Sequence, residues 1–169
     1  LELSIEETGA VIRCDQLPVI TGIPLQMSQL FLNLFTNALK FTERRPEITI
    51  SVQPALAEER VKFNFPLKET DYLRIAFTDN GIGFDTKYAE RIFSIFQRLH
   101  TVEKYAGTGI GLALCKKIVD NHGGVISVES EPGQGTTFYL FFPFDKSLNE
   151  HHSFSFRQTG SAGSATVIR

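Results

Sequence analysis

The segment from Leu25 to Phe41, LQMSQLFLNLFTNALKF, constrains the fold more strongly than any other stretch of the chain. When the segment is placed on a helix at about 100° per residue, its polar side chains fall in one narrow stripe. Apolar side chains cover most of the remaining circumference, so we predict a largely buried helix that starts near Pro24. The stripe is made of Gln26, Gln29, Asn33, Asn37 and Lys40.

Two asparagines on this stripe raise a question of function. Asn33 and Asn37 are one helical turn apart, and Lys40 lies a further turn along. Asparagine is a poor helix former, and its amide costs free energy when it is buried without a partner. The stripe could simply face solvent, although solvated stripes are usually wide and rich in Glu and Lys. Amide oxygens are also suitable ligands for a hard cation, with Lys40 facing phosphate nearby. This segment alone leaves both interpretations open.

The rest of the pattern predicts strands and helices mixed in one domain. We expect extended segments at Val11–Ile20, Glu47–Gln53, Tyr72–Thr78, Val125–Ser130 and Thr136–Phe142. We expect further helices at Thr86–Phe96, as one helix or two short ones, and at Ile110–Asn121. This order is not a strict βαβα alternation, so it favours an α+β sandwich with one sheet and helices on one face.

Two regions have no clear helix or strand period. Residues 54–71 are irregular and charged, although Phe63, Phe65 and Leu67 alternate as a possible edge strand. From Asp145 the composition shifts to Ser, Gly, His and Thr. We therefore expect a domain at residues 1–144, followed by a tail or linker at residues 145–169.

The triplet Asp79-Asn80-Gly81 follows the strand expected at Tyr72–Thr78. It is a common two-residue hairpin turn, and a hairpin should return at once to alternating apolar residues. A second glycine, Gly83, and a charged run follow instead. The triplet therefore needs an explanation other than a tight hairpin.

Three further glycines, Gly107, Gly109 and Gly111, lie where a loop becomes a helix. Helix N-termini carry unpaired N–H groups and a positive dipole end, which together favour phosphate binding. Leu112 occupies the third glycine position of the dinucleotide fingerprint, and Lys116 comes too late for a P-loop, so both of those motifs are excluded. A simple flexible joint between loop and helix is the alternative interpretation.

Composition excludes several classes of protein. The chain has 169 residues and a net charge of −2, which suits one domain without electrostatic attraction to nucleic acid or membrane. Cys14 and Cys115 lack metal-ligand spacing, and we expect buried, reduced thiols in a reducing compartment. No apolar run approaches the ~20 residues that span a bilayer, and no signal peptide is visible. The sequence starts without methionine in mid-pattern, so we expect it to be a piece of a longer protein.

Five segments, taken in order, resemble the sequence boxes of sensor histidine kinases. They are QLFLNLFTNALKF (29–41, N box), DNGIG (79–83, first glycine box), IFSIF (92–96, F box), GTGIGL (107–112, second glycine box) and GQGTTF (133–138, the last glycine-containing turn). The resemblance extends over residues 1–143 in the right order and spacing. The chain is therefore similar to the catalytic, ATP-binding domain of a bacterial two-component sensor histidine kinase.

This resemblance implies a fold. Histidine kinases share the Bergerat-type ATP-binding fold with DNA gyrase, the MutL mismatch-repair protein and a heat-shock chaperone. The expected architecture is a two-layer α/β sandwich, with a mixed, mostly antiparallel sheet and three helices on one face.

The resemblance also implies how the adenine half of ATP is bound. Asp79 would accept a hydrogen bond from the adenine amino group. Gly81 and Gly83 would let the backbone pass close to the nucleotide, and Thr137 would add a further nucleotide contact from the last glycine-containing turn.

For the phosphate half, the resemblance implies Asn37 as the Mg²⁺ ligand, with the catalytic positions Asn33 and Lys40 beside the phosphates. A lid at residues 97–108 would close on the nucleotide through Arg98 and Lys104. Phe93 and Phe96 would anchor this lid to the core. Further contacts would come from the loop-to-helix joint at Gly107, Thr108, Gly109, Ile110, Gly111 and Leu112.

The acceptor of the phosphoryl group is expected outside the chain. None of the histidines, His100, His122, His151 and His152, is followed by an acidic residue that could act as base. The resemblance implies that ATP–Mg²⁺ donates its γ-phosphoryl group to a histidine on a dimerisation domain of the same protein. A response regulator is the expected downstream partner, and nucleic acid is not expected. The expected location is cytoplasmic, with membrane contact only through regions outside this chain.

Two alternatives remain at this stage, an ATPase of the gyrase or MutL kind and a non-catalytic interaction module that depends on nucleotide. Hydrolysing relatives carry a glutamate base at the position of Asn33, whose amide cannot accept a proton, so transfer is favoured over hydrolysis. One departure concerns Gly22-Ile23-Pro24, which lacks the acidic residue that relatives often carry at the start of this helix. We expect only a local change in helix capping there.

Overall fold

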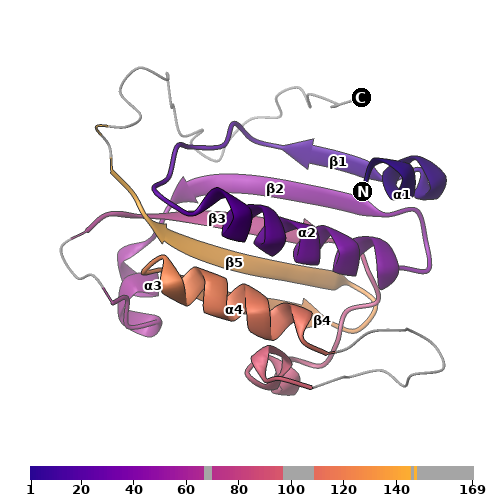
Figure 1. Ribbon diagram of the computed structural model, residues 1–169. Helices are drawn as coiled ribbons and strands as arrows, with labels where there is room; N and C mark the ends of the chain where they lie inside the picture. Colours follow the sequence, from indigo (N-terminus) through magenta and orange to yellow (C-terminus); the bar gives the residue numbers. More distant parts are fainter. Residues whose placement is uncertain (67–69, 97–108, 146, 148–169) are drawn as a thin grey trace, which may run out of the picture.

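The computed structural model describes residues 1–66, 70–96, 109–145 and 147. Its centre is a five-stranded sheet with the order β1-β2-β3-β5-β4 (Figure 1). The first pair of strands is parallel and the other neighbours are antiparallel, which confirms the expected mixed, mostly antiparallel sheet. The strands are β1 (Val11–Cys14), β2 (Glu47–Pro54), β3 (Tyr72–Asp79), β4 (Val125–Glu131) and β5 (Gly135–Pro143).

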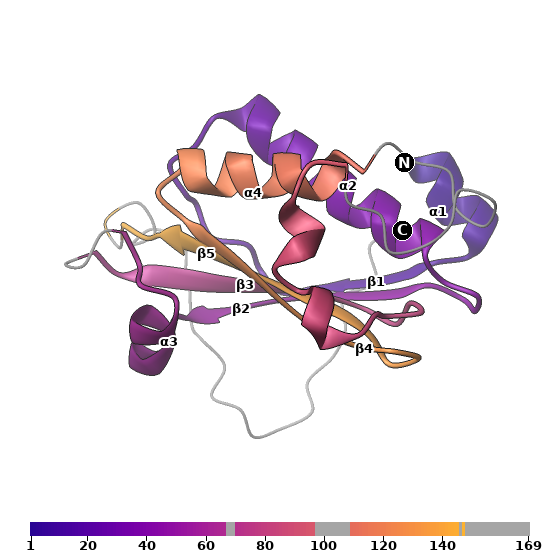
Figure 2. The same cartoon turned by 90° about the horizontal axis from the view of Figure 1, so that it is seen from below.

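Helices form a second layer on one face of the sheet (Figure 2). α1, α2 and α4 lie on this face, and the short α3 lies on the other face. The two-layer α+β architecture expected from the sequence is therefore confirmed. The helices are α1 (Glu2–Thr8), α2 (Pro24–Lys40), α3 (Ala57–Lys62) and α4 (Gly111–Asn121), with two 3₁₀ helices, η1 (Thr86–Tyr88) and η2 (Arg91–Phe93).

The main core lies between this helical layer and the sheet. From the sheet it receives Ile48, Ile50, Ile75, Phe77, Ile126, Val128, Phe138, Leu140 and Phe142, and from the helices Leu30, Leu34, Ala38, Ile92, Cys115, Ile118 and Val119. Alternate residues of each strand enter this core, because successive side chains of a strand point to opposite faces. The strong alternation read from the sequence of β3 is thus the pattern of a strand covered by helices.

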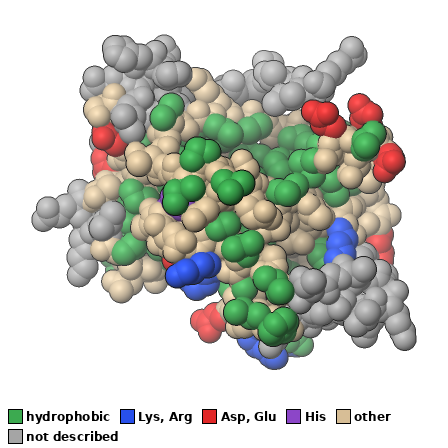
Figure 3. All heavy atoms as spheres, viewed as in Figure 1, with side chains coloured by type: hydrophobic (Ala, Val, Ile, Leu, Met, Phe, Trp, Pro, Cys, Tyr) green, Lys and Arg blue, Asp and Glu red, His purple; other side chains and the backbone are tan. Residues whose placement is uncertain are grey.

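α2 is the predicted long helix, and its apolar side packs on the sheet as expected. Its outer side carries a stripe that the sequence prediction did not single out, with Leu25 80% exposed and Leu32 45% exposed. Figure 3 shows hydrophobic side chains at the surface of the molecule on the side of this helical layer. The helix is therefore half-embedded, with polar and apolar groups both reaching its surface.

The segment between β2 and β3 contradicts the possible edge strand. The chain forms α3 there, and Leu67 lies outside the described residues. Phe63 and Phe65 follow the end of α3 and join an apolar cluster with Tyr72 and Phe141 on the second face of the sheet. The alternation of the two phenylalanines therefore reflects the packing of a helix end and not a strand.

Three smaller differences separate the structure from the sequence prediction. α1 was not predicted, and only the first half of the expected extended segment at Val11–Ile20 is a strand. Beyond that strand, Asp15 instead accepts a hydrogen bond from Val52 N through Oδ2, at 3.1 Å. Residues 86–96 form two short 3₁₀ helices, which is one of the two forms expected.

No helix in the described ranges is long and apolar enough to cross a membrane. Of the expected tail at residues 145–169, the structure describes only Asp145 and Ser147. The domain boundary at residue 144 therefore stays a prediction.

Candidate functional site

Asp79 is the last residue of β3, and it is held between β2 and β5, opposite Ile48 and Thr136. Its Oδ1 accepts a hydrogen bond from Gly81 N at 2.8 Å. Burial raises the pKa of this carboxyl above its ordinary value of 3.8, while backbone hydrogen bonds from Gly81 and Thr136 act in the opposite direction. A partly buried carboxylate held by backbone groups is a fixed acceptor at a strand end, which suits recognition of a ligand N–H group.

The two glycines after Asp79 allow backbone segments to meet closely. A Cβ on Gly81 would lie 2.5 Å from the carbonyl oxygen of Phe41, and a Cβ on Gly83 would overlap the carbonyl oxygen of Glu131. Gly83 also has a φ of 61°, in the left-handed region that favours glycine. The turn after β3 is therefore packed against the end of α2 on one side and the β4–β5 turn on the other.

Asn80 joins this turn by hydrogen bonds to the loop that follows α2. Its Oδ1 accepts a hydrogen bond from Glu47 N at 2.9 Å, and its Nδ2 donates to the carbonyl oxygen of Arg45 at 3.0 Å. Arg44 donates from Nε to the carbonyl oxygen of Asn80 at 3.0 Å. The carboxylate of Asp79 thus points inward, and the amide of Asn80 fixes the backbone beside it. Because this backbone is bound to the loop after α2, the chain does not return as the second strand of a hairpin.

The structure does not bring Thr137 to this site. Residues that pair across antiparallel strands point to the same face, so Thr136, the partner of Asp79, shares its face. Thr136 is 8% exposed, and its Oγ1 lies 3.0 Å from Ser130 Oγ. Thr137 points to the other face, where its Oγ1 lies 3.0 Å from Thr78 Oγ1. Thr136, which the sequence interpretation did not name, is therefore the threonine that shares the face of Asp79.

The polar stripe of α2 meets the start of α4. Asn33 donates from Nδ2 to the carbonyl oxygen of Gly111 at 3.4 Å, and its Oδ1 accepts from Gln29 Nε2 at 3.3 Å. Asn37 and Lys40 are half-buried further along the same helix, and the Lys40 ammonium lies 4.6 Å from the centre of the Phe41 ring. The two expected catalytic positions are thus on the expected stripe, and Asn33 contacts the glycine joint directly.

Cys115 lies beneath Asn33 in the core. Burial raises the pKa of its thiol to about 12, and a hydrogen bond from Asn33 acts in the opposite direction. The thiol is fully buried, as expected from its apolar surroundings. Cys14 is half-buried, and burial raises its pKa as well. Neither thiol is therefore placed or ionised for chemistry near neutral pH.

The start of α4 supplies the expected backbone donors. Gly109 has a φ of 71°, Ile110 is the N-cap, and Gly111 is the first residue of the helix. Leu112 packs against the main core, so only its backbone N–H is available to a ligand. The remaining expected contacts, Arg98, Lys104, Gly107 and Thr108, lie outside the described residues.

One of the two expected anchoring phenylalanines does not anchor. Phe93 packs against the core, with its ring centre 6.5 Å from that of Phe138. Phe96 is 74% exposed and has a φ of 64°, an unusual backbone conformation for an aromatic residue. Its backbone N–H donates to the carbonyl oxygen of Gly109 at 3.1 Å, so the contact that Phe96 provides comes from its main chain.

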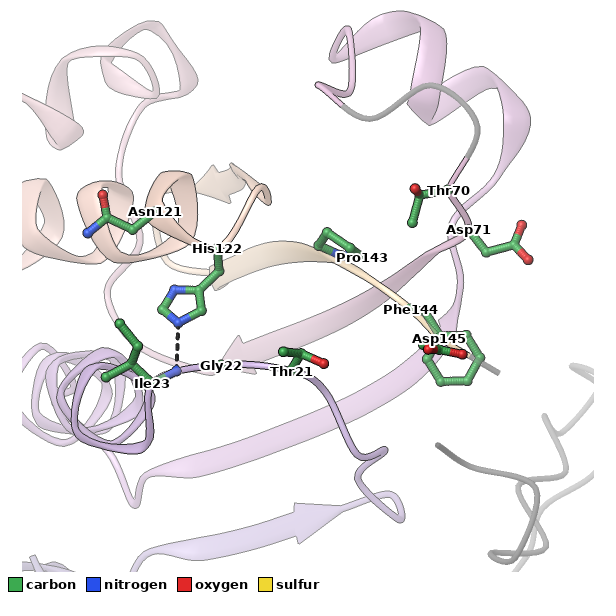
Figure 4. Close-up of a pocket in the computed structure, with 10 residues that line it drawn as sticks. All are labelled: Thr21, Gly22, Ile23, Thr70, Asp71, Asn121, His122, Pro143, Phe144 and Asp145. Carbon is green, nitrogen blue, oxygen red and sulfur yellow. Dashed lines mark hydrogen bonds between the residues drawn. The ribbon is translucent and has the colours of Figure 1, made fainter. Parts of the chain in front are cut away.

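These parts meet at one end of the molecule. The end of β3, the start of β5, the end of α2 and the start of α4 all lie at the same end of the sandwich (Figure 1). A hollow of about 800 Å³ lies at the opposite end, between the start of α2, the end of α4 and the end of β5 (Figure 4). The hollow is therefore separate from the Asp79 site, and the Asp79 site is the better match to the sequence motifs.

His122 lines that hollow and completes the start of α2. Its Nε2 accepts a hydrogen bond from Ile23 N at 2.9 Å, and its Nδ1 lies 2.7 Å from the carbonyl oxygen of Ile118 (Figure 4). This pattern requires a neutral ring with the proton on Nδ1. The expected change in capping near Gly22 is thus visible, because His122, the residue that follows α4, takes the place of a local capping side chain.

The chemistry of the donors fits a metal that arrives with a nucleotide. Among the described residues there is no group of three or more His, Cys, Asp or Glu side chains that could hold a metal ion. Asn37 offers an amide oxygen on the half-buried stripe of α2. Because Mg²⁺ in such sites is held by few protein ligands together with phosphate oxygens, a single amide is a fitting protein contribution.

Comparison with known proteins identifies this arrangement. The profile of the family described as histidine kinase-, DNA gyrase B- and HSP90-like ATPase matches residues 22–146. The chain belongs to this family of ATPase domains. The matched range contains both the aspartate at the end of β3 and the glycine joint at the start of α4.

Within this family, the chain is similar to the catalytic domains of histidine kinases. It is 42% identical over 144 residues to phytochrome-like protein Cph1 of Synechocystis sp., covering 85% of this chain and 17% of that protein. It is 34% identical over 131 residues to the circadian input-output histidine kinase CikA of Synechococcus elongatus, covering 76% of this chain and 16% of that protein. The chain thus spans about a sixth of these relatives.

Solved structures agree with this similarity. Full-length ShkA in complex with AMPPNP superimposes with a TM-score of 0.63 at 28% identity, covering 84% of this chain and 27% of that one. The catalytic domain of histidine kinase ThkA superimposes with a TM-score of 0.62 at 25% identity, covering 84% and 85%. The resemblance read from the five sequence boxes is confirmed.

Proposed function

We propose that this domain binds ATP with Mg²⁺ and donates the γ-phosphoryl group to a histidine on a separate dimerisation domain of the same protein. The observation that carries the proposal is Asp79, a partly buried carboxylate at a strand end that is held by backbone N–H groups between two glycine turns. The binding of AMPPNP by the similar protein ShkA supports it.

Each part of the site has a task in this reaction. Asp79 accepts a hydrogen bond from the adenine amino group and so selects the base. The free N–H groups at the start of α4 and the Lys40 ammonium bind phosphate oxygens. Asn37 would hold Mg²⁺, and the bound Mg²⁺ would neutralise charge on the phosphates. Phosphoryl transfer requires mainly positioning and charge neutralisation, so no nucleophile is needed from this chain.

Transfer is favoured over hydrolysis by the surroundings of Asn33. Its amide donates to the carbonyl oxygen of Gly111 and accepts from Gln29, so it is engaged on both sides. An amide has no proton-accepting capacity comparable to that of a carboxylate, and it cannot activate water as a general base. A response regulator that receives the phosphoryl group from the histidine, and a cytoplasmic location, complete the proposal.

The proposal is tested with the isolated domain and a purified dimerisation domain that carries the acceptor histidine. ATP analogue with Mg²⁺ should raise the thermal midpoint of the domain, because a ligand that binds only the native state stabilises it. Radiolabelled phosphate from ATP should appear on the dimerisation domain only when both are mixed, and not when its histidine is replaced. Steady ATP hydrolysis by the isolated domain, or no thermal shift with nucleotide, would contradict the proposal.

A further inference from the structure

The first turn of α4 has few stabilising interactions within the helix itself. It begins at a glycine, Gly111, and another glycine, Gly109, lies two residues before it with a φ of 71°. Its N-cap residue, Ile110, provides no side-chain hydrogen bond to the helix. Glycine has large conformational freedom, and a helix start without a side-chain cap lacks the stabilisation that such a cap provides. A turn that presents N–H groups to phosphate therefore needs support from outside the helix.

That support comes from Asn33 on α2. Asn33 Nδ2 donates to the carbonyl oxygen of Gly111 at 3.4 Å, which joins the helix start to the most regular element of the layer. A Cβ on Gly111 would lie at an ordinary van der Waals distance of 3.7 Å from Asn33 Oδ1, so the Asn33 amide lies directly beside the Gly111 backbone. The amide of Asn33 thus acts on the position of α4 through a directional hydrogen bond to Gly111, beside its hydrogen bond to the Cys115 thiol on the same helix.

This hydrogen bond requires one orientation of the Asn33 amide. If the amide were rotated by half a turn, Oδ1 would face the Gly111 carbonyl oxygen, and two acceptors would oppose each other. Gln29 Nε2 donates to Asn33 Oδ1 at 3.3 Å, one helical turn earlier on the same stripe, and this favours the orientation that reaches Gly111. The result is a relay of two amides from Gln29 through Asn33 to the first turn of α4.

We propose that Gln29 is a positioning residue for the phosphate half of the nucleotide. It holds the Asn33 amide in the orientation that anchors Gly111, and so keeps the N–H groups of the first turn of α4 in place. The proposal rests on the nucleotide function proposed above. It concerns the phosphates only, because the base is recognised at Asp79, which belongs to another part of the sheet.

Because Gln29 acts on the phosphates and Asp79 on the base, replacing Gln29 should reduce the affinity for ATP but not the affinity for adenosine. Replacement of Gln29 weakens binding of ATP with Mg²⁺ about tenfold, the effect of one lost hydrogen bond of ordinary strength. Binding of adenosine, which has no phosphate, stays within about twofold of the wild type. A residue with a merely structural role would weaken both ligands together, so the ratio of the two affinities is the informative quantity.

Two substitutions remove the donor in different ways. Q29L removes the amide without adding charge, and Q29E keeps the shape of the side chain but loses the N–H donor. Q26L is the matched control, because Gln26 lies on the same stripe of α2 and its Oε1 has no hydrogen-bond partner among the described residues. Q26L should leave both affinities unchanged. If Q29L does not fold, as judged by its far-ultraviolet circular dichroism, Q29E carries the same test.

The affinities are measured by calorimetry for ATP with Mg²⁺ and by amide chemical-shift titration for adenosine. Amide hydrogen exchange of Leu114, whose N–H donates to the carbonyl oxygen of Ile110 at 2.9 Å, reports on the first turn of α4 without any ligand. Exchange at Leu114 should be faster in Q29L than in the wild type or in Q26L. In an N33A background, Q29L should have little further effect, because Gln29 acts through Asn33.

The outcomes separate the two proposals. A wild-type domain that binds neither ATP nor adenosine overturns the proposed nucleotide function. A wild-type domain that binds both, together with equal losses or no loss in the Gln29 variants, overturns only the role of Gln29. An effect of Q29L that persists in full in the N33A background overturns it as well, since the relay would then not pass through Asn33.

Discussion

Replacing Asp79 by Asn separates the binding role of this residue from its effect on stability. The substitution keeps the size of the side chain and an oxygen that can still accept the hydrogen bond from Gly81 N, which is 2.8 Å long in the structure. It removes the negative charge, and it places an amide that can turn its donor toward the adenine amino group. The expected result is a domain that folds at least as well as the wild type but binds ATP poorly.

The magnitude for binding follows from the type of hydrogen bond. A hydrogen bond to a charged acceptor contributes about 1.5–3 kcal/mol, which corresponds to a loss of about 10- to 150-fold in ATP affinity. Binding should also weaken on acidification, because the protonated carboxyl of Asp79 is a poorer acceptor. Since the pKa of Asp79 is raised above 3.8, this loss begins at a higher pH than for an exposed aspartate.

For stability the sign is opposite. Burial raises the pKa of Asp79, so the folded state binds this proton more tightly than the unfolded state. The carboxyl therefore favours folding most below pH 3.8, and stability is lost as the pH rises through the folded pKa. At neutral pH the buried charge is a penalty that D79N removes. The free energy of unfolding of D79N should equal or exceed that of the wild type at pH 7.

Calorimetric titration with ATP and Mg²⁺, together with urea unfolding at pH 7, measures both effects. D85N is the matched control, because Asp85 is exposed and its pKa is lowered, mainly by hydrogen bonds with Lys87. Its contribution to stability is present above the ordinary pKa and is lost on acidification, so D85N should be slightly less stable and should bind ATP normally. ATP affinity in D79N equal to that of the wild type would refute the adenine role of Asp79. A marked destabilisation of D79N at pH 7 would refute the argument from burial.

Two further predictions concern side chains that hold the backbone. N80A should lower the free energy of unfolding by about 1–2 kcal/mol and weaken ATP binding, because it removes the hydrogen bonds to Glu47 N and Arg45 O that fix the turn after Asp79. Urea unfolding measures the stability and calorimetry measures the ATP affinity. An unchanged ATP affinity would contradict the link between this turn and the site. H122A should lower stability by about 1–2 kcal/mol by removing the acceptor of Ile23 N, with ATP affinity unchanged because His122 lies at the opposite end of the sheet. The neighbouring N121A, at an exposed position, should leave stability nearly unchanged.

The parts of the fold that could be predicted are those with a local period. The helix at α2 and the strands β2, β3, β4 and β5 all follow from apolar residues at regular spacing, because each has one face against the same core. α1 was missed because it is a seven-residue helix with no buried side chain and no side-chain cap, and so it has a weak pattern. α3 was missed because Phe63 and Phe65 alternate for a reason unrelated to a strand.

Prediction of the candidate site from sequence has a different limit, which is the register in which the strands pair. Thr136 and Thr137 are adjacent and chemically identical, and only the pairing of Thr136 with Asp79 decides which one faces the site. That pairing depends on the β4–β5 turn and on β3, which are more than fifty residues apart in the sequence. Likewise, no local signal links His122 to Ile23, since 99 residues separate the two partners.

Asp79 is the residue of the candidate site whose presence is hardest to explain by folding alone. Its carboxyl is partly buried, and the groups that oppose the resulting rise in pKa are backbone N–H groups of its own turn and of the adjacent strand. Such a placement disfavours folding at neutral pH, so folding alone gives no reason for an aspartate there. A residue that contradicts the usual preferences for burial and secondary structure often has a role in ligand binding. The aspartate, the two glycines that give it room and the amide that fixes its turn are adjacent in the sequence because they act on one short piece of backbone. This stretch therefore departs from a hairpin pattern visibly, whereas the resemblance to histidine kinases required all five sequence boxes.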